Sequence, residues 1–575
     1  MPESRWQPSS LRDSVLLLGS GISCWHPSNA PTGSEITAEI FAAIFDGLPI
    51  ESVQTHLAHI IRTPFEVVNH HAPIQPAALN ALYCGLLDVP APNTLHHDIA
   101  ALLLAGRVRA VVSTNYDTGI EQAAKQIGTS IVATMDYNGT PPCAPILFKV
   151  HGSCDEPSTL ICRLSQESRL DESKAALLKH MLAGRQLIAI GYSGIDFEIC
   201  PVIAESSVSR VVWLTRPGDR ADSPGLRVIA KRHHIERIEW DLRYGMPWQP
   251  LIHPLARASG SEKVRDTILN RLSVHRRRLW ALRIACATGN ARLAALIIDS
   301  DLRCPHAAWQ AELGFAHFQA GHYRQAGEAF QAYVLLRATR AARLTRSRFL
   351  AGKRVAGHEI GAEFVEAVAY LFHAAAAWRA HGSAYRSLTA GLLARMLAGG
   401  LGRCSTRLPG RSAKWDAELM HALVSSRLRL FLPTAAASWM LRWTWRRAQT
   451  QGHKTSDVYL QRQAEAELLA LGSHEDQIDL FQSVYEPIGY TGQILSKYEM
   501  SVRTPTVPEF TLAYDLACDL GNHPAAFRVA SGAYRMADPI VALIWRTRAV
   551  YHLSACEVNS STIARMLDDL DAPAR

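Results

Sequence analysis

Two residues in the first third of the chain have side chains suited to catalysis, Asn115 and His151. Asn115 lies in Ser-Thr-Asn-Tyr-Asp, directly after the apolar run Val108–Val112. An asparagine amide donates and accepts hydrogen bonds, so it can orient a sugar hydroxyl and a water molecule together. His151 follows the run Pro145–Val150, and histidine can act as a general base near neutral pH. Together they could activate water beside a bound sugar.

Asp117 adds a carboxylate two residues after Asn115. It could orient the same water molecule or a hydroxyl of the sugar. Asparagine and aspartate are also preferred residues at the first position of a helix, so they could instead cap a helix expected over residues 118–126. Asp117 could serve both purposes, and the sequence leaves this choice open.

A glycine-containing loop, Gly19-Ser20-Gly21-Ile22-Ser23, follows an apolar run at residues 15–18. Because glycine has no Cβ, backbone N–H groups of this loop could approach a pyrophosphate closely. The third glycine of the full dinucleotide-binding fingerprint is missing. A tight structural turn is therefore an equally good interpretation of this loop.

A second glycine-containing loop, Gly-Tyr-Ser-Gly-Ile-Asp, occupies residues 191–196 after the apolar run 187–190. Gly191, Ser193 and Asp196 could hold a ribose or a phosphate. Asp196 could equally cap the helix that follows. This loop and the three before it are the candidate pieces of a single site.

Each of the four loops follows an apolar run that is typical of a buried strand. Between residues 13 and 241 such runs alternate with helical patterns, which favours an α/β fold with a mostly parallel, doubly wound sheet. Loops at the carboxyl ends of parallel strands line the ligand crevice of such a sheet. We therefore predict one nucleotide-sized site built from the four loops. The expected strands are 15–18, 108–112, 131–135, 145–150, 187–190, 211–214 and 235–240.

The pattern predicts two domains joined by a linker. Residues 34–106 are mostly helical and too long for one crossover helix, so we expect a helical insertion in the first domain, 1–246. A proline-containing stretch, 247–262, reads as the linker. From there helix-period sequence continues nearly to the end, which predicts an all-α domain over 263–575.

One helix pair of the second domain fits a tetratricopeptide unit. Its small residues Gly314 and Ala326 would let two helices approach closely, with aromatic side chains in the groove between them. Looser echoes follow at residues 374–382 and 520–530 without a fixed period. We expect a tetratricopeptide-like solenoid, because such repeats stabilise each other by stacking.

Length and composition limit the class of protein. A chain of 575 residues exceeds one ordinary core, and its 48% hydrophobic and 19% charged residues are typical of a soluble globular protein. No run of 18 apolar residues exists, and the start lacks the apolar core of a signal peptide, so we expect a cytoplasmic protein without a membrane span. The 11 cysteines include no Cys-x-x-Cys pair, which disfavours a structural metal site.

Charge gives little sign of a nucleic-acid partner. The net charge of +8 is modest for this length. Arg337, Arg340, Arg343 and Arg346 recur every third residue, and a solvated face or a docking surface for an acidic partner is favoured over nucleic-acid binding. Tryptophans 439 and 443 are expected to pack in the repeat core. We expect the helical domain to bind a protein trigger, a partner subunit or another copy of itself.

In their order and spacing, the four loops resemble the signatures of the sirtuin-like family of NAD-dependent proteins. Those signatures are a Gly-Ala-Gly-hydroxyl loop, a Thr-x-Asn-x-Asp loop, a His-Gly pair and a late Gly-x-Ser. The resemblance covers about residues 13 to 240 and implies a Rossmann-type domain that binds NAD as its substrate, with Asn115 and His151 as the catalytic pair. The residues implied to line the NAD cleft are Gly19, Ser20, Gly21, Ser23, Thr114, Asp117, Gly191 and Ser193.

The chain departs from classical sirtuin deacylases in two places. It has no four-cysteine zinc ribbon after the histidine, and residues 24–35 lack the acidic-aromatic-arginine segment of the nicotinamide pocket. What remains is similar to the bacterial sirtuin-like branch of anti-phage defence proteins, which cleave NAD when an attached domain senses infection. The resemblance implies a conditional NAD hydrolase controlled by its helical domain. A lethal activity needs a switch, and assembly is a common one, so we also expect a homo-oligomer. A sirtuin-type deacylase and a non-catalytic NAD or ADP-ribose sensor are the alternatives.

Overall fold

The chain divides into two compact units, which we describe separately. The first holds the described residues between 11 and 46 and between 65 and 276, and the second holds residues 47, 48 and 53 and those from 277 onward. The domain limits expected from the sequence, 1–246 and 263–575 with a linker between them, stay a prediction. The computed structural model describes residues 11–12, 14–48, 53, 65–135, 145–163, 170–194, 198–218, 224–257, 261–300, 307–350, 357–404, 442–450, 511, 514–515, 517–536, 539–558 and 560–571.

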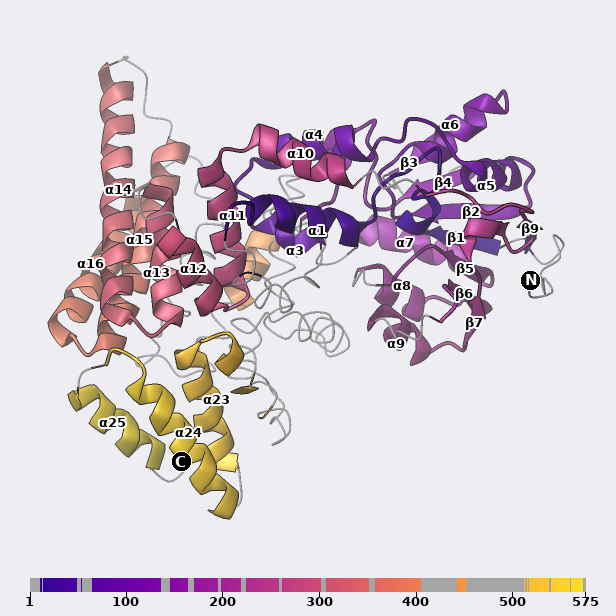
Figure 1. The fold of residues 1–575 in the computed structure, drawn as a ribbon. Helices are drawn as coiled ribbons and strands as arrows, with labels where there is room; N and C mark the ends of the chain where they lie inside the picture. The colour runs from indigo at the N-terminus through magenta and orange to yellow at the C-terminus, as the bar shows by residue number, and fades with distance from the viewer. Residues whose placement is uncertain are drawn as a thin grey trace. The chain divides into compact units, whose positions relative to one another are not determined.

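The first unit is built on a seven-stranded parallel sheet in the order β3-β4-β2-β1-β5-β6-β7 (Figure 1). All seven predicted strands are present, and their limits differ from the prediction by at most two residues. A short antiparallel pair, β8 and β9, follows the sheet. The strands are β1 Ser14–Leu18, β2 Val108–Ser113, β3 Ala133–Thr134, β4 Ile146–Lys149, β5 Gln186–Ile190, β6 Arg210–Thr215, β7 Ile235–Glu239, β8 Gly245–Met246 and β9 Gln249–Pro250.

The strand order reverses between β1 and β5. From β1 the chain continues to β2 on one side, whereas β5, β6 and β7 follow one another on the other side. This is the Rossmann-like α/β arrangement that the sequence predicts. In such sheets, ligands bind beyond the carboxyl ends of the strands at the point of reversal. The first and fourth predicted loops leave the sheet at that point, directly after β1 and β5.

The helical insertion between β1 and β2 is confirmed. Four described helices lie there: α1 Gly33–Ile44, α3 Phe65–His70, α4 Pro76–Leu87 and α5 Thr94–Leu104. The other helices of the first unit are α6 Gly119–Gln126, α7 Glu172–Leu182, α8 Ile199–Glu205, α9 Pro224–Ala230 and α10 Glu262–Arg271, with short 3-10 turns η2 Ser20–Ile22, η3 Pro157–Thr159 and η5 Leu242–Tyr244.

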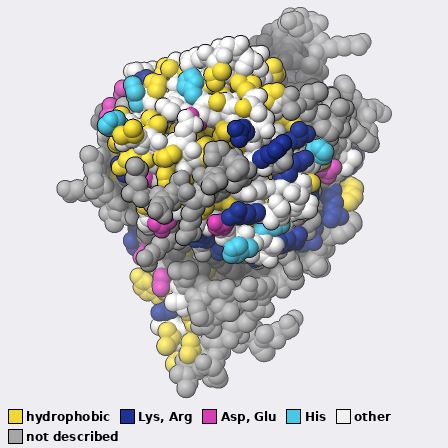
Figure 2. Space-filling model, turned by 90° about the vertical axis from the view of Figure 1, so that its right-hand side faces the viewer, with side chains coloured by type: hydrophobic (Ala, Val, Ile, Leu, Met, Phe, Trp, Pro, Cys, Tyr) yellow, Lys and Arg dark blue, Asp and Glu magenta, His cyan; other side chains and the backbone are white. Residues whose placement is uncertain are grey.

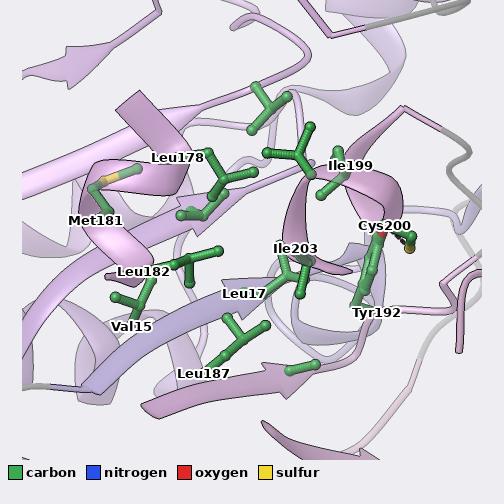
Figure 3. Packing of buried hydrophobic residues seen from close by; sticks show 14 of the residues in the cluster. Val15, Leu17, Leu178, Met181, Leu182, Leu187, Tyr192, Ile199, Cys200 and Ile203 are labelled. Atoms are coloured by element: carbon green, nitrogen blue, oxygen red, sulfur yellow. Dashed lines mark hydrogen bonds between the residues drawn. The ribbon is translucent and has the colours of Figure 1, made fainter. Parts of the chain in front are cut away.

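The sheet has an apolar core on each face, because successive side chains of a strand point to opposite sides. On β1, Leu16 and Leu18 pack in the cluster that includes α5 and α6. Val15 and Leu17 pack in the opposite cluster, together with Leu178 of α7 and other residues of α7 and α8 (Figure 3). Strands buried on both faces read as continuous apolar runs, which is why they could be located from the sequence.

The described residues of the second unit contain helices and no strand, as predicted for this half. In this part of the chain, as in the first unit, no described helix is long and apolar enough to cross a membrane. The helices are α11 Val274–Ala287, which begins just before the unit, α12 Ala291–Ser300, α13 Ala307–Gln319, α14 Tyr323–Leu350, α15 Gly357–His381, α16 Ala384–Cys404, α23 His523–Met536, α24 Pro539–Ser554 and α25 Ser560–Asp571.

The helix pair predicted around Gly314 forms the hairpin of α13 and α14. A Cβ on Gly314 would lie 2.3 Å from the Phe330 ring, so only glycine permits this approach. Phe330 packs in one cluster with Ala326 and with Trp378 of α15. However, α14 spans 28 residues, whereas a complete tetratricopeptide unit of two helices has about 34 residues. The tetratricopeptide-like solenoid therefore stays a prediction.

The prediction that Trp443 packs in a repeat core is wrong. Its side chain is 51% exposed with the Arg447 guanidinium 5.7 Å from the ring centre, whereas Trp445 is buried. Helical spacing identifies residues that share a face but does not tell which face is covered. The expected partner, Trp439, lies outside the described residues.

The basic residues of α14 do not form one uniform face. Arg337 contacts Glu366 at 2.7 Å and lies over the Tyr333 ring, whereas Arg340 and Arg343 are exposed. Figure 2 shows another face of the protein, on which lysine and arginine side chains gather in a few groups among hydrophobic and histidine side chains.

Candidate functional site

The four predicted loops begin at one row of residues across the sheet. Leu18 of β1 pairs in register with Ser113 of β2 on one side and with Ile190 of β5 on the other. Ser113 pairs in turn with Lys149 of β4. These are the last residues of the four strands, so all four loops leave the sheet side by side.

Asn115 and His151 occupy equivalent positions on neighbouring strands. Each lies two residues beyond a member of the aligned pair Ser113 and Lys149. The sheet hydrogen bonding continues one step past that pair, because Val150 N donates to Ser113 O at 3.0 Å. The structure therefore brings the two predicted catalytic residues to the same end of adjacent strands. Both are nearly buried, with 7% and 4% of their surfaces exposed.

The glycines of the first and fourth loops pack against each other. Gly21 N donates to Gly191 O at 3.0 Å, and a Cβ on Gly19 would lie 2.5 Å from that same oxygen. Gly191 has φ +61°, and its own Cβ would lie 2.9 Å from Ile22 N. These contacts give the glycines a structural role in joining the two loops at the switch point. Their predicted role in holding a pyrophosphate stays a prediction.

Ser23 is the centre of a buried hydrogen-bond network. Its hydroxyl donates to Asp117 Oδ2 at 2.7 Å and accepts from Asn115 Nδ2 at 3.1 Å. His96 Nε2 lies 3.1 Å from the same oxygen. Because the backbone N–H of Asn93 can only donate, its 3.2 Å contact makes His96 Nδ1 an acceptor and leaves the proton on Nε2. The Ser23 hydroxyl therefore donates once and accepts twice.

Asp117 makes a contact at the start of the next helix, and its role toward water or a sugar hydroxyl stays a prediction. Its Oδ1 accepts from Gly119 N at 2.9 Å in the first turn of α6, while Oδ2 holds Ser23. His96 approaches the same carboxylate, with Nε2 3.7 Å from Oδ1. Burial lowers the pKa of His96, although the carboxylate of Asp117 opposes this, so the ring is neutral near pH 7.

The amide of Asn115 is held in one orientation. Its Nδ2 donates to the backbone oxygen of Gly19 at 3.2 Å, besides its contact with Ser23. A carbonyl oxygen can only accept, so the amide nitrogen must be the atom on that side. The Oδ1 atom makes no hydrogen bond to any residue in the described part of the chain. It is the atom of Asn115 that a ligand could contact.

Lys149, the last residue of β4, joins the second loop to the third. Its side chain is buried, and Nζ donates to the backbone oxygen of Asp117 and, at 2.7 Å, to Ser153 Oγ. The same ammonium group lies 3.1 Å from Glu121 Oε1. Burial raises the pKa of Glu121, and the charge of Lys149 partly offsets this. A buried lysine with these acceptors fixes the loops that carry Asn115 and His151.

His151 contacts a buried glutamate that the sequence did not point to. Its Nε2 lies 2.9 Å from Glu198 Oε1, and the two side chains are 5% and 0% exposed. Glu198 directly precedes α8, four residues after the Gly-Tyr-Ser-Gly segment of the fourth loop. It follows no apolar run, so the strand-end argument could not find it.

The other predicted site residues with polar side chains are Thr114, Ser20, Ser193 and Asp196. Thr114 donates through Oγ1 to Leu18 O at 3.2 Å, so its hydroxyl braces β1. Ser20 is half-buried in η2, and Ser193 is exposed beyond β5. Asp196 lies outside the described residues. Among the residues that the structure describes, no group of three or more histidine, cysteine or acidic side chains could hold a metal ion.

His96 contacts the predicted site through Ser23, although it belongs to none of the four predicted loops. A local signal does exist, because Asn93 and His96 form a reciprocal cap at the start of α5. Its contact with Ser23 joins residues far apart in the sequence. Spacing along the chain cannot reveal such a contact.

Comparison with known families adds one finding. Residues 109–212 match the family described as SIR2-like domain. The match runs from β2 into β6 and contains Asn115, His151 and Glu198. No curated protein matches the chain. The match supports a sirtuin-like family for the α/β unit and is consistent with an NAD-related activity.

Proposed function

We propose that the α/β unit is an NAD hydrolase that produces nicotinamide and ADP-ribose. The observation that carries the proposal is the placement of Asn115 and His151 at equivalent positions beyond the ends of adjacent strands, inside the SIR2-like match. The site also lies beside the switch point of the sheet, where doubly wound folds bind nucleotides.

The chemistry required of the protein is limited. Hydrolysis breaks the bond between the nicotinamide nitrogen and C1′ of the ribose, and the bonding electrons leave with nicotinamide and neutralise its ring. Positive charge develops on the ribose, water adds to C1′, and a proton must be removed. Asn115 Oδ1 would accept a hydrogen bond from the water or a ribose hydroxyl, and His151 would take the proton. A general base contributes about 100-fold to 10,000-fold to such a rate.

Two other functions remain as alternatives. A sirtuin-type deacylase would transfer an acyl group from lysine to ADP-ribose, but the chain lacks the cysteine pairs of the zinc ribbon that accompanies the peptide groove in that family. A sensor would bind NAD or ADP-ribose without turnover. Neither alternative is favoured by a contact in the site.

The test is to incubate the full chain with NAD and separate the products by chromatography. The hydrolase proposal predicts equal amounts of nicotinamide and ADP-ribose. O-acyl-ADP-ribose formed only with an acyl-lysine peptide would establish the deacylase. Binding in calorimetry without any product would establish the sensor. If the chain neither binds NAD nor turns it over, the assignment of the site is overturned.

We further propose that the hydrolase is a conditional effector of bacterial anti-phage defence. In this proposal the helical domain binds a protein trigger, and the chain acts as a homo-oligomer. The support is the joining of a SIR2-like unit to a helical unit in one chain. Bacteria that express the chain should lose NAD after phage infection, and cells expressing His151→Ala should not. Equal NAD levels in the two strains during infection would contradict this role.

A further inference from the structure

We propose that Glu198 is the positioning residue for His151, and that its carboxylate fixes the imidazole ring and stabilises the imidazolium formed when the ring accepts a proton. This inference rests on the proposed NAD hydrolysis for its kinetic consequence. The contact between His151 and Glu198 is present in the protein without substrate.

The geometry of the pair supports a specific contact. His151 Nε2 and Glu198 Oε1 are 2.9 Å apart, and the glutamate side chain is fully buried. A buried carboxylate is costly unless a cation or hydrogen-bond donor compensates it. Neither carboxylate oxygen of Glu198 makes a hydrogen bond to any residue in the described segments, and neither does His151 Nε2, so their 2.9 Å contact is an ion-pair contact without hydrogen-bond geometry.

The contact places a carboxylate beside the proposed base. When the imidazole of His151 takes a proton from water, the resulting positive charge lies beside the carboxylate of Glu198 in a buried site, where their attraction is strong.

The other charged groups around the histidine are engaged elsewhere. Lys149 on β4 holds Glu121 of α6, and Lys174 of α7 donates through Nζ to the backbone oxygen of Val150 at 3.0 Å. The ring of Tyr116, after β2, has its centre 6.4 Å from that of His151. Within the described residues, Glu198 is the charged group with a 2.9 Å contact to the imidazole.

The kinetic test compares Glu198→Gln with Glu205→Gln. Glu205 ends the same helix on the surface, where it pairs with Lys179, and is the matched control. In Glu198→Gln we expect kcat to fall about 10-fold or more, because the base is weaker and the imidazolium has lost its counter-charge. The acidic limb of the pH–rate profile should move to lower pH by about one unit, because the imidazolium loses a neighbouring negative charge. Glu205→Gln should change neither.

A second variant separates position from charge. Glu198→Asp keeps the carboxylate but shortens the side chain by one methylene group. We expect its acidic limb to stay at the wild-type pH while kcat falls less than in Glu198→Gln. It also keeps the inference testable if Glu198→Gln does not fold, which circular dichroism will reveal. If Glu198→Gln instead turns over NAD faster than wild type, Glu198 blocks the base and the inference is overturned.

A spectroscopic test needs no turnover. NMR of the full chain labelled with ¹⁵N and ¹³C histidine follows the titration of His151, whose signals are assigned by their loss in His151→Gln. In Glu198→Gln the titration midpoint should move to lower pH, because the imidazolium loses a neighbouring negative charge. An unchanged midpoint would overturn the inference. The same shift in a protein that leaves NAD intact would overturn only the proposed function.

Discussion

The Ser23 hydroxyl uses its whole hydrogen-bonding capacity, with one bond to Asp117 and two contacts from Asn115 and His96. The three partners are buried, so none can replace a lost hydrogen bond with bulk water. Ser23 was predicted to line the NAD cleft, but its contacts make it the residue that holds the loops together. The side chains predicted for chemistry are therefore also part of the support of the site.

We predict that Ser23→Ala lowers the free energy of unfolding by about 1–3 kcal/mol, the usual cost of leaving buried polar groups unsatisfied. Urea denaturation at pH 7 measures this. The control is Ser34→Ala, in the exposed first turn of α1, which should change stability by less than about 0.5 kcal/mol. Equal losses in the two variants would contradict the role of the network.

Asp98 on α5 gives a prediction about pH. Burial raises its pKa from the usual value of 3.8 to about 6, and its Oδ2 makes no hydrogen bond to a described residue. The folded protein keeps this proton at pH values where the unfolded chain has lost it. The contribution of Asp98 to stability is therefore fully present below about pH 4, is lost as the pH rises through 6, and is constant above.

Asp98→Asn removes this dependence. We expect the variant to gain stability relative to wild type between pH 4.5 and pH 7.5, as measured by urea denaturation at both values. Asp299→Asn, at an exposed position of α12, should show the same difference from wild type at both pH values. A difference for Asp98→Asn that does not change with pH would contradict the assigned burial.

The residues of the site could be predicted only in part. Asn115, Asp117 and His151 follow buried strands, so the sequence located them. His96 lies on α5 and Glu198 lies directly before α8, and their contacts depend on how those helices pack. A pattern that records only neighbours along the chain contains no signal for such contacts.

At the scale of elements, the strands were the most predictable part of the fold. The apolar runs of β1, β2, β4, β5 and β6 reflect burial on both faces, which gives a signal along the chain itself. The order of the strands has no such signal, because pairing such as that of Leu18 with Ile190 joins residues far apart in sequence. The same limit explains the error at Trp443, whose exposure depends on what covers its helix.

The junction between the first and fourth loops can be tested with two glycines of similar backbone conformation. Gly191 and Gly184 have φ +61° and +69°, but a Cβ at Gly184 would meet no atom within 4 Å. Gly184→Ala should lower the free energy of unfolding by about 1–2 kcal/mol for the left-handed backbone alone. Gly191→Ala should lose about a further 1–3 kcal/mol, because its Cβ would push against Ile22.

Both glycine variants are compared with wild type by urea denaturation. Gly191→Ala should also weaken NAD binding in calorimetry, since the loop after β1 would have to move. Gly184 lies at the other end of β5, before the strand begins, and its variant should bind NAD like wild type. Equal losses of stability in the two variants would argue against close packing of the loops.

At the scale of the whole molecule, the two compact units allow separate unfolding. We predict two calorimetric transitions for the full chain of His151→Ala, a variant that we expect not to consume NAD. NAD at 100 times its Kd should stabilise the α/β unit by about 2.7 kcal/mol and leave the other transition in place. A shift of only the helical transition would place the NAD site outside the α/β unit.

The most direct test of the central claim is the fate of NAD in the presence of the purified full chain, followed by chromatography for wild type, Asn115→Ala and His151→Ala. We predict nicotinamide and ADP-ribose in equal amounts from wild type, and rates at least about 100-fold lower from both variants. His180→Ala, on the exposed end of α7, should match wild type. Undiminished NAD cleavage by His151→Ala and Asn115→Ala would contradict the account.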